Sequence, residues 1–310
     1  MNGEAPLILH HFDASPFAEK IRLALGIKGL SWRGVEIPMV MPKPKLTALT
    51  GGYRKTPVLQ IGADIYCDTL LIALELERRF PKPSLFPNGN RAYALTAAAW
   101  ADERLFRPGA ALSMGTNQDL PEPLLADRRA FFNFLDFTSL EDRVPHFYAQ
   151  FRSQLALTNE LLTQSLGAYL AGESPGWLDV LAYFPLWMAR ANVSAAGELL
   201  ESFDALLAWE QRMATLGHGN PTSMPAEEAL EFARSSSSES EPGIAPGAWP
   251  RGLSVGASVS VTPDDYGQDA VHGTLWQLSD DRIALRREDP LAGNVVVHFP
   301  RIGFELTNEA

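Results

Sequence analysis

The stretch that decides the fold is Ser15-Pro16-Phe17-Ala18-Glu19-Lys20-Ile21-Arg22-Leu23-Ala24-Leu25, which directly follows the run Leu7-Ile8-Leu9-His10-His11-Phe12. The first run is typical of a buried strand. Ser followed by Pro is a common helix start, because the Ser side chain caps free N–H groups and Pro needs no N–H at the first helical position. An apolar stripe then repeats at helical spacing, and we expect the charged residues between to face away from it: Glu19, Lys20 and Arg22.

The turn before this helix has electrostatic properties that suit an anion. Free N–H groups at a helix start carry about half a positive charge, and a hydroxyl beside them can donate to an anion placed there. We therefore interpret Ser15 as a residue that could hold a thiolate. The alternative, that Ser15 is only a helix cap, is equally consistent with these residues alone.

Length and charge limit the classes of function. A chain of 310 residues can form two or three domains, and its net charge of −11 argues against a nucleic-acid or anionic-membrane partner, which needs clustered Lys and Arg. No apolar run reaches the roughly 18 residues that cross a bilayer, and the N-terminus lacks signal-peptide features. We expect a cytoplasmic protein. Its six histidines show no metal-ligand spacing, so no metal is expected.

Cysteine use excludes one chemistry. Cys67 is the single cysteine, so no intrachain disulfide can form. A Cys-x-x-Cys redox protein would carry its pair at the start of the first helix, where this chain has Ser15-Pro16-Phe17-Ala18. Disulfide exchange at that turn is therefore excluded, and we interpret Cys67 as a small apolar strand residue rather than a nucleophile.

The first 81 residues follow a recognisable order of elements. Residues 32–37 favour a second strand, and two short apolar strands around Gly62 favour an antiparallel hairpin. Asp68-Thr69 then begins a helix that ends near Phe80, before Pro81. The order β-α-β followed by β-β-α predicts a thioredoxin-like α/β domain.

At this point the chain resembles the cytosolic glutathione S-transferases. Its Ser-Pro-Phe motif is similar to that of the plant tau class, whereas the omega class has Cys where Ser15 stands. The segment Lys55-Thr56-Pro57-Val58-Leu59 resembles the one that carries the family's cis-proline, and Asp68-Thr69 resembles the pair that binds the γ-glutamyl end of glutathione. An all-helical second half completes the likeness.

The resemblance implies a site for glutathione as co-substrate, without a metal. Asp68 would pair with the γ-glutamyl ammonium, and Thr69 with the helix-start N–H groups would receive its carboxylate. Thr56, before the cis-Pro57, would pair main chain to main chain with the cysteinyl unit. Lys55, with Arg54 as a possible second cation, would lie beside the other carboxylate. Asp in place of the commoner Glu at position 68 shortens that arm by one methylene.

The rest of the chain divides by composition into further parts. We predict a thioredoxin-like domain at 1–81, a linker at 82–92, an all-helical domain at 93–233, a flexible linker at 234–248 and a small barrel-like β module at 249–310. Helical periodicity is clearest over 93–114, 124–137, 151–169 and 203–214. The segment from Gly172 to Tyr183 resembles the start of a buried helix in the family. There the family pattern has a Ser or Thr cap three residues before an Asp, whereas this chain has Gly176 three residues before Asp179.

The β module is not part of the ordinary transferase pattern. A ligand or oligonucleotide surface could be built from Arg286, Arg287 and Arg301 with Trp276 and Phe299. We favour a solvated face, because five aspartates outweigh these cations: Asp264, Asp265, Asp269, Asp280 and Asp281.

The resemblance therefore predicts a glutathione transferase that forms a homodimer, with glutathione and a small electrophile as its partners. Ser15 would stabilise the thiolate, which attacks the electrophile bound between the two domains against aromatic side chains. One alternative is a glutathione-dependent isomerase or dehalogenase on the same site. The other is a non-catalytic dimeric binding or regulatory protein that uses the fold and the β module.

Overall fold

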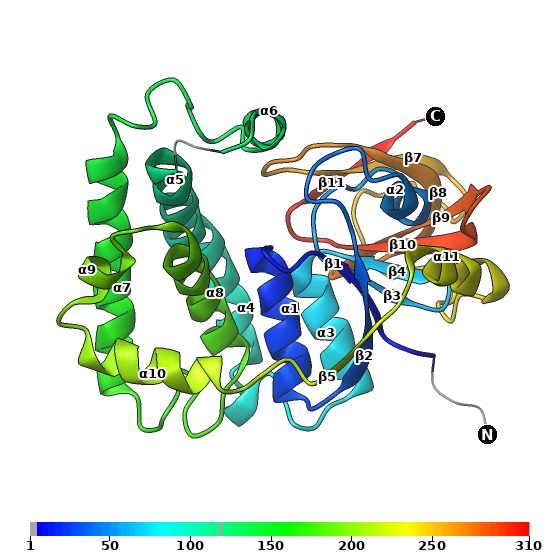
Figure 1. Ribbon diagram of the computed structural model, residues 1–310. Coiled ribbons are helices and arrows are strands. Elements are labelled where there is room, and N and C mark those ends of the chain that lie inside the picture. Colours follow the sequence, from blue (N-terminus) through cyan, green and yellow to red (C-terminus); the bar gives the residue numbers. More distant parts are fainter. Residues whose placement is uncertain (1–4, 118–119, 310) are drawn as a thin grey trace.

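The computed structural model of the protein describes residues 5–117 and 120–309. Three groups of elements follow one another along the chain (Figure 1). The first group is β1 (Ile8–His11), α1 (Pro16–Ile27), β2 (Ser31–Glu36), α2 (Pro44–Thr50), β3 (Val58–Ile61), β4 (Asp64–Cys67) and α3 (Thr69–Arg79). The second is η1 (Pro87–Gly89), α4 (Arg91–Trp100), η2 (Ala101–Phe106), α5 (Arg107–Thr116), α6 (Glu122–Phe131), α7 (Val144–Gln164), α8 (Trp177–Asn192), α9 (Ala196–Leu200) and α10 (Asp204–Ala214). The third is β5 (Asn220–Ser223), α11 (Ala226–Ser235), β6 (Gly243–Ile244), β7 (Ser258–Pro263), β8 (Val271–Leu278), β9 (Arg282–Asp289), β10 (Gly293–Pro300) and β11 (Phe304–Asn308).

The first group confirms the thioredoxin-like order. β1 pairs in parallel with β2, through Ile8 and Arg33, and antiparallel with β3, through Leu9 and Leu59. β3 and β4 form the expected hairpin. A parallel β1–β2 pair requires a crossover, and α1 supplies it.

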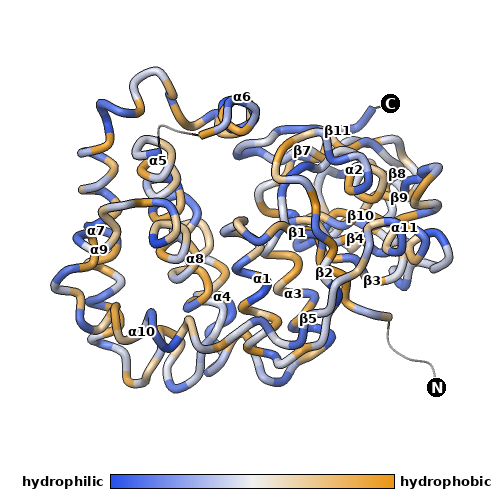
Figure 2. The backbone as a smooth tube through the Cα atoms, viewed as in Figure 1, coloured by the Kyte–Doolittle hydropathy of each residue, from blue (hydrophilic) through white to orange (hydrophobic). Residues whose placement is uncertain are grey.

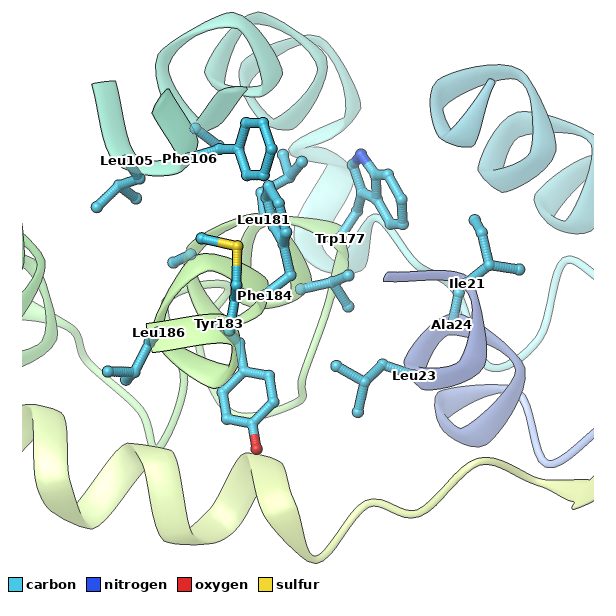
Figure 3. Close-up of a cluster of buried hydrophobic side chains, with 14 of the residues drawn as sticks. Ile21, Leu23, Ala24, Leu105, Phe106, Trp177, Leu181, Tyr183, Phe184 and Leu186 are labelled. Atoms are coloured by element: carbon cyan, nitrogen blue, oxygen red, sulfur yellow. The ribbon is translucent and has the colours of Figure 1, made fainter. Parts of the chain in front are cut away.

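Helix α1 begins as expected but is buried on more sides than its stripe predicts. Ser15 caps it, and its apolar face packs against α8, where the rings of Phe17 and Phe184 lie 5.2 Å apart. Ile21 and Ala24 belong to the same buried cluster as Trp177 (Figure 3). The expectation that its charged residues face away from the interior is wrong: Glu19, Lys20 and Arg22 are 3%, 1% and 5% exposed. The reason is that the helix lies between the two domains, and the charged side chains find partners there.

Those partners are specific. Lys20 Nζ donates to Asp102 Oδ1 at 2.7 Å, from the second domain. Arg22 Nε donates to Glu19 Oε2 at 2.9 Å, and Glu19 also contacts His218 Nε2 at 3.0 Å. The charges are therefore buried as hydrogen-bonded pairs, which is the usual condition for burying them.

The second group is all-helical, as expected, although the range predicted for it, 93–233, also contains β5, which pairs with β2. Its helix α8 consists mostly of apolar residues (Figure 2). Asp179, in the first turn of α8, accepts hydrogen bonds from the Leu170 N–H at 2.7 Å and the Gly176 N–H at 3.0 Å. Its carboxylate also accepts from Trp209 Nε1 at 2.9 Å. The helix predicted for 124–137 ends at Phe131 instead. Beyond it the Asp136 carboxylate accepts from Thr138 and Ser139, a local pattern that competes with helix.

The third group confirms an extra β module, and its strands extend the first sheet. β10 pairs in parallel with β4, so that Val297 lies opposite Ile65, and the strand order is β11-β7-β8-β9-β10-β4-β3-β1-β2-β5 (Figure 1). Helices α1 and α3 cover one face of the thioredoxin-like sheet, and the helical domain packs beyond them. Residues on the other face, such as Val58 and Ile65, pack with module residues such as Val259 and Leu285.

The Ser-rich stretch expected to be a flexible tether lies along this junction. Ser238 Oγ and the Glu239 N–H both donate to the Asp64 carboxylate, each at 2.7 Å. Trp276 Nε1 donates to the Ser240 carbonyl at 3.0 Å. In the described parts of the chain, no helix is both long and apolar enough to span a bilayer.

Candidate functional site

A cavity of about 290 Å³ opens between the thioredoxin-like and helical parts. This is near the lower end of the size of small-molecule sites, which runs from ~300 to 1,000 Å³. All the residues expected to bind glutathione line it: Ser15, Lys55, Thr56, Pro57, Asp68 and Thr69. The structure therefore brings together segments that are up to 54 residues apart in the sequence.

Ser15 lies at the start of α1, in the turn that follows β1. Its N–H donates to the Phe12 carbonyl at 3.1 Å, and its Oγ accepts from the Ala18 N–H at 3.2 Å. The hydroxyl thus uses an acceptor lone pair as a helix cap, which leaves its proton available for donation. Capping and donation to a thiolate are compatible in this geometry.

The loop before β3 supplies backbone and a hydroxyl. The Thr56–Pro57 peptide bond is cis, as the resemblance implies. Lys43 Nζ donates to the Thr56 Oγ1 at 3.3 Å and to the Arg54 carbonyl at 3.2 Å, so the loop is held from α2's N-terminal side.

Asp68 and Thr69 begin α3 at the floor of the cavity. Asp68 has φ 73° and ψ 137°, a conformation rarely adopted by residues other than glycine, and strain of this kind concentrates at ligand sites. Its Oδ1 accepts from the Leu70 N–H at 2.8 Å. Burial raises the pKa of the Asp68 carboxyl, although Lys55 and Lys20 act against it. A cationic group of a ligand would stabilise this carboxylate.

Several cations also line the cavity. Arg54 donates to Asp127 of α6 at 2.5 Å, and Arg128 donates to the other oxygen of the same carboxylate at 2.8 Å. Lys55 forms an ion pair with Asp265, a residue of the β module. Lys43 is buried, and this burial, together with Arg128 and Arg54, lowers its pKa to about 8.

The part of the cavity that faces the helical domain is aromatic. Phe17 of α1 packs against Phe106 with ring centroids 4.7 Å apart, and Phe106 lies near Phe132 at 6.2 Å. Phe106 ends η2, a π-helical segment, and π segments of this kind are frequent at functional sites. Tyr266 of the β module adds a ring 5.5 Å from Phe132.

Comparison with known proteins identifies the family. The family model described as the glutathione S-transferase N-terminal domain matches residues 9–84. A crystal structure of a GST-like protein from Pseudomonas syringae is 36% identical and superposes with a TM-score of 0.76, covering 98% of this chain and 100% of that one. The chain belongs to the glutathione S-transferase family.

Two further glutathione S-transferases are similar over less of the chain. Glutathione S-transferase U4 of Arabidopsis thaliana is 26% identical over 229 residues, which is 72% of this chain and 91% of the plant protein. The tau-class enzyme from mango, Mangifera indica, is 21% identical with a TM-score of 0.52 over 69% of this chain and 90% of its own, and shows the shared fold. The coverage of the Pseudomonas syringae protein, by contrast, extends over the β module.

Several residues of this glutathione S-transferase site were not predicted from sequence. Lys43 was missed because it stands among prolines with no motif around it, and Tyr266 because its place depends on the fold. Cys67 is buried and burial raises its pKa well above the usual range, in keeping with a structural strand residue. Of the cationic and aromatic residues noted in the module, Phe299 is fully buried and belongs to the core rather than to any surface.

Proposed function

We propose that the protein is a glutathione transferase whose Ser15 hydroxyl stabilises the glutathione thiolate for attack on a small electrophile. The single observation that supports this most is the convergence of Ser15, Thr56, Pro57, Asp68 and Thr69 on one cavity. A thiol with a pKa near ~8.5 is only a few per cent ionised at neutral pH, so a donor hydroxyl at a helix start favours the reactive form.

The two ends of the tripeptide have complementary partners in this arrangement. The γ-glutamyl ammonium would meet the enclosed Asp68 carboxylate, and Thr69 with the first N–H groups of α3 would receive the adjacent carboxylate. At the other end Lys43 and Lys55 flank the loop that carries Thr56. Lys43 is the better placed to receive the terminal carboxylate, since its Nζ donates to neutral oxygens while Lys55 is paired with Asp265.

The electrophile would bind on the aromatic side of the cavity. Phe17, Phe106, Phe132 and Tyr266 offer faces and edges to a flat apolar substrate. An aromatic halide activated by nitro groups is therefore the first substrate to test.

The decisive experiment is the Ser15→Ala substitution. We expect kcat/KM for glutathione conjugation to chlorodinitrobenzene to fall at least about tenfold, since removal of one donor to a developing anion typically costs ~10²-fold to 10³-fold. Glutathione affinity and the free energy of unfolding should be measured alongside, because loss of the cap alone costs about 1 kcal/mol. Undiminished turnover would refute the role of Ser15.

The same assays separate the alternatives. Turnover of an isomerisable or halogenated substrate without conjugation would favour isomerase or dehalogenase chemistry. Absence of glutathione binding at millimolar ligand would favour a non-catalytic binding protein.

We also propose that the protein is a homodimer, that it is cytoplasmic and that it divides into domains at 1–81, 93–233 and 249–310. Light scattering, cell fractionation and limited proteolysis, respectively, would test these three proposals.

A further inference from the structure

The loop that joins β7 to β8 reaches from the C-terminal module into the cavity. Asp265 and Tyr266 of this loop both line it. Tyr266 is only 7% exposed, because its ring packs against Phe131 at 5.1 Å and Phe132 at 5.5 Å, at the end of α6. The module is thus in contact with both of the other parts at the site.

Close fitting holds this loop in place. Asn133 Nδ2 donates to the Asp265 carbonyl at 3.3 Å. Gly267 has φ +59°, and a Cβ there would lie 2.5 Å from Phe131 Cε2, so the loop approaches α6 as closely as a glycine allows. The Asp265 side chain is therefore presented to the cavity by an anchored backbone.

Lys55 is held by this loop. Its Nζ donates to Asp265 Oδ1 and lies 4.3 Å from the centroid of the Tyr266 ring. The Lys55 side chain is 11% exposed and that of Asp265 is 37% exposed, so the pair is partly shielded from water but open toward the cavity. A ligand carboxylate that approached Lys55 would compete with the carboxylate of Asp265 for one ammonium group.

The neighbouring cations also have partners within the protein. Arg54 and Arg128 share the Asp127 carboxylate, and Arg107 pairs with Glu103 at 2.5 Å. Lys43 donates instead to the neutral oxygens of Arg54 and Thr56. Two guanidinium groups share one carboxylate, so this half of the cavity keeps an excess of positive charge to which Lys43 adds, whereas the charge of Lys55 is offset by Asp265.

We propose that Asp265 of the C-terminal module is a specificity-determining residue of the glutathione site. The site would otherwise prefer thiol peptides with a terminal carboxylate over those with a terminal amide. Because Asp265 holds Lys55, it weakens this preference. This inference rests on the proposed function and deepens it. Physically, pairing with Asp265 removes most of the attraction that Lys55 would exert on an anion, while a neutral amide is indifferent to it.

The test compares two ligands and two variants of the full chain. The ligands are S-methylglutathione and its glycine amide, whose blocked thiols keep Ser15 chemistry out of the measurement, and affinities are taken by calorimetry. We expect Asp265→Asn to bind the carboxylate ligand about fivefold more tightly and the amide less than twofold differently. Asp264→Asn removes the same charge one residue away, at an exposed position, and should change neither affinity by more than about twofold.

A double-substitution cycle assigns the gain to Lys55. Lys55→Gln alone leaves the Asp265 carboxylate without its cation and should weaken binding of the carboxylate ligand about fivefold, whereas Lys55→Gln added to Asp265→Asn should abolish the fivefold gain. Asp265→Ser should reproduce the effect of Asp265→Asn if the lost charge is its cause. Equal tightening for both ligands, or a gain that persists without Lys55, would overturn the inference. If neither the unsubstituted protein nor any variant bound either ligand at millimolar concentration, the proposed function would be overturned, and the inference with it.

Discussion

Two of the acid–base pairs between the C-terminal module and the thioredoxin-like part differ sharply in burial. Asp64 of β4 and His298 of β10 are both fully buried and joined at 2.7 Å, and Asp64 also accepts from Ser238 and the Glu239 N–H. Lys55 and Asp265, at the cavity, remain partly exposed. The first carboxylate has three donors around it from two segments, whereas the second can exchange its partner for a ligand.

The difference shows how burial separates a structural pair from a functional one. Burial opposes ionisation of Asp64, but its three hydrogen bonds outweigh that effect and lower its pKa, and burial lowers the pKa of His298. Asp64 is therefore favoured as a carboxylate that accepts from the His298 ring. A group held in this way stabilises the junction between β4 and β10 and offers nothing to solvent.

The largest effect that this comparison predicts is on stability at the buried junction. Asp64→Ala removes the acceptor of three donors, of which His298 is fully buried, so we expect the free energy of unfolding to fall by about 3 kcal/mol. Urea denaturation of the full chain measures it. Asp280→Ala, at an exposed position, is the control and should change stability by less than about 0.5 kcal/mol. If the two variants were equally stable, the buried pair would not be what stabilises the junction between β4 and β10.

A second prediction sharpens the comparison through Lys43. Its pKa of about 8 means that the ammonium is mostly present at pH 7 and mostly lost at pH 9, whereas an ordinary lysine stays charged over this range. Affinity for an anionic ligand should therefore fall as pH rises through 8. We expect S-methylglutathione to bind up to about tenfold more weakly at pH 9 than at pH 7 by calorimetry.

The matched control is Lys43→Arg. Arginine stays charged at both pH values, so this variant isolates the contribution of the ligand's own titration. Parallel pH profiles for the two proteins would mean that Lys43 does not receive the terminal carboxylate.

The smallest effect concerns the stability contributed by the pair at the cavity. Because Lys55 and Asp265 are partly solvated, Asp265→Asn should change the free energy of unfolding by less than about 1 kcal/mol. Thermal unfolding of the same protein used for binding measures this. A loss comparable to that of Asp64→Ala would show that Asp265 holds the module in place and would weaken its assignment to ligand selection.

Local sequence patterns could predict much of the fold because the interactions behind them are short in range. The Ser15 cap with Pro16, the hairpin around Gly62 and the helix start at Asp68 each depend on a few neighbouring residues, and the structure has all three. Asp136 shows the limit, since its hydrogen bonds to Thr138 and Ser139 lie just beyond the end of a helix that periodicity alone extends too far.

By itself the sequence determined the thioredoxin-like order, the helical domain, the existence of a β module and the set of residues around Ser15 that line the cavity. Tertiary structure alone decided which charges are paired. Lys20 meets Asp102 across 82 residues and Lys55 meets Asp265 across 210, and in a sequence each of these groups is typical of a solvated surface. The physical reason is that an ion pair depends on distance and exclusion of water, both of which arise only when the sheets and helices pack together.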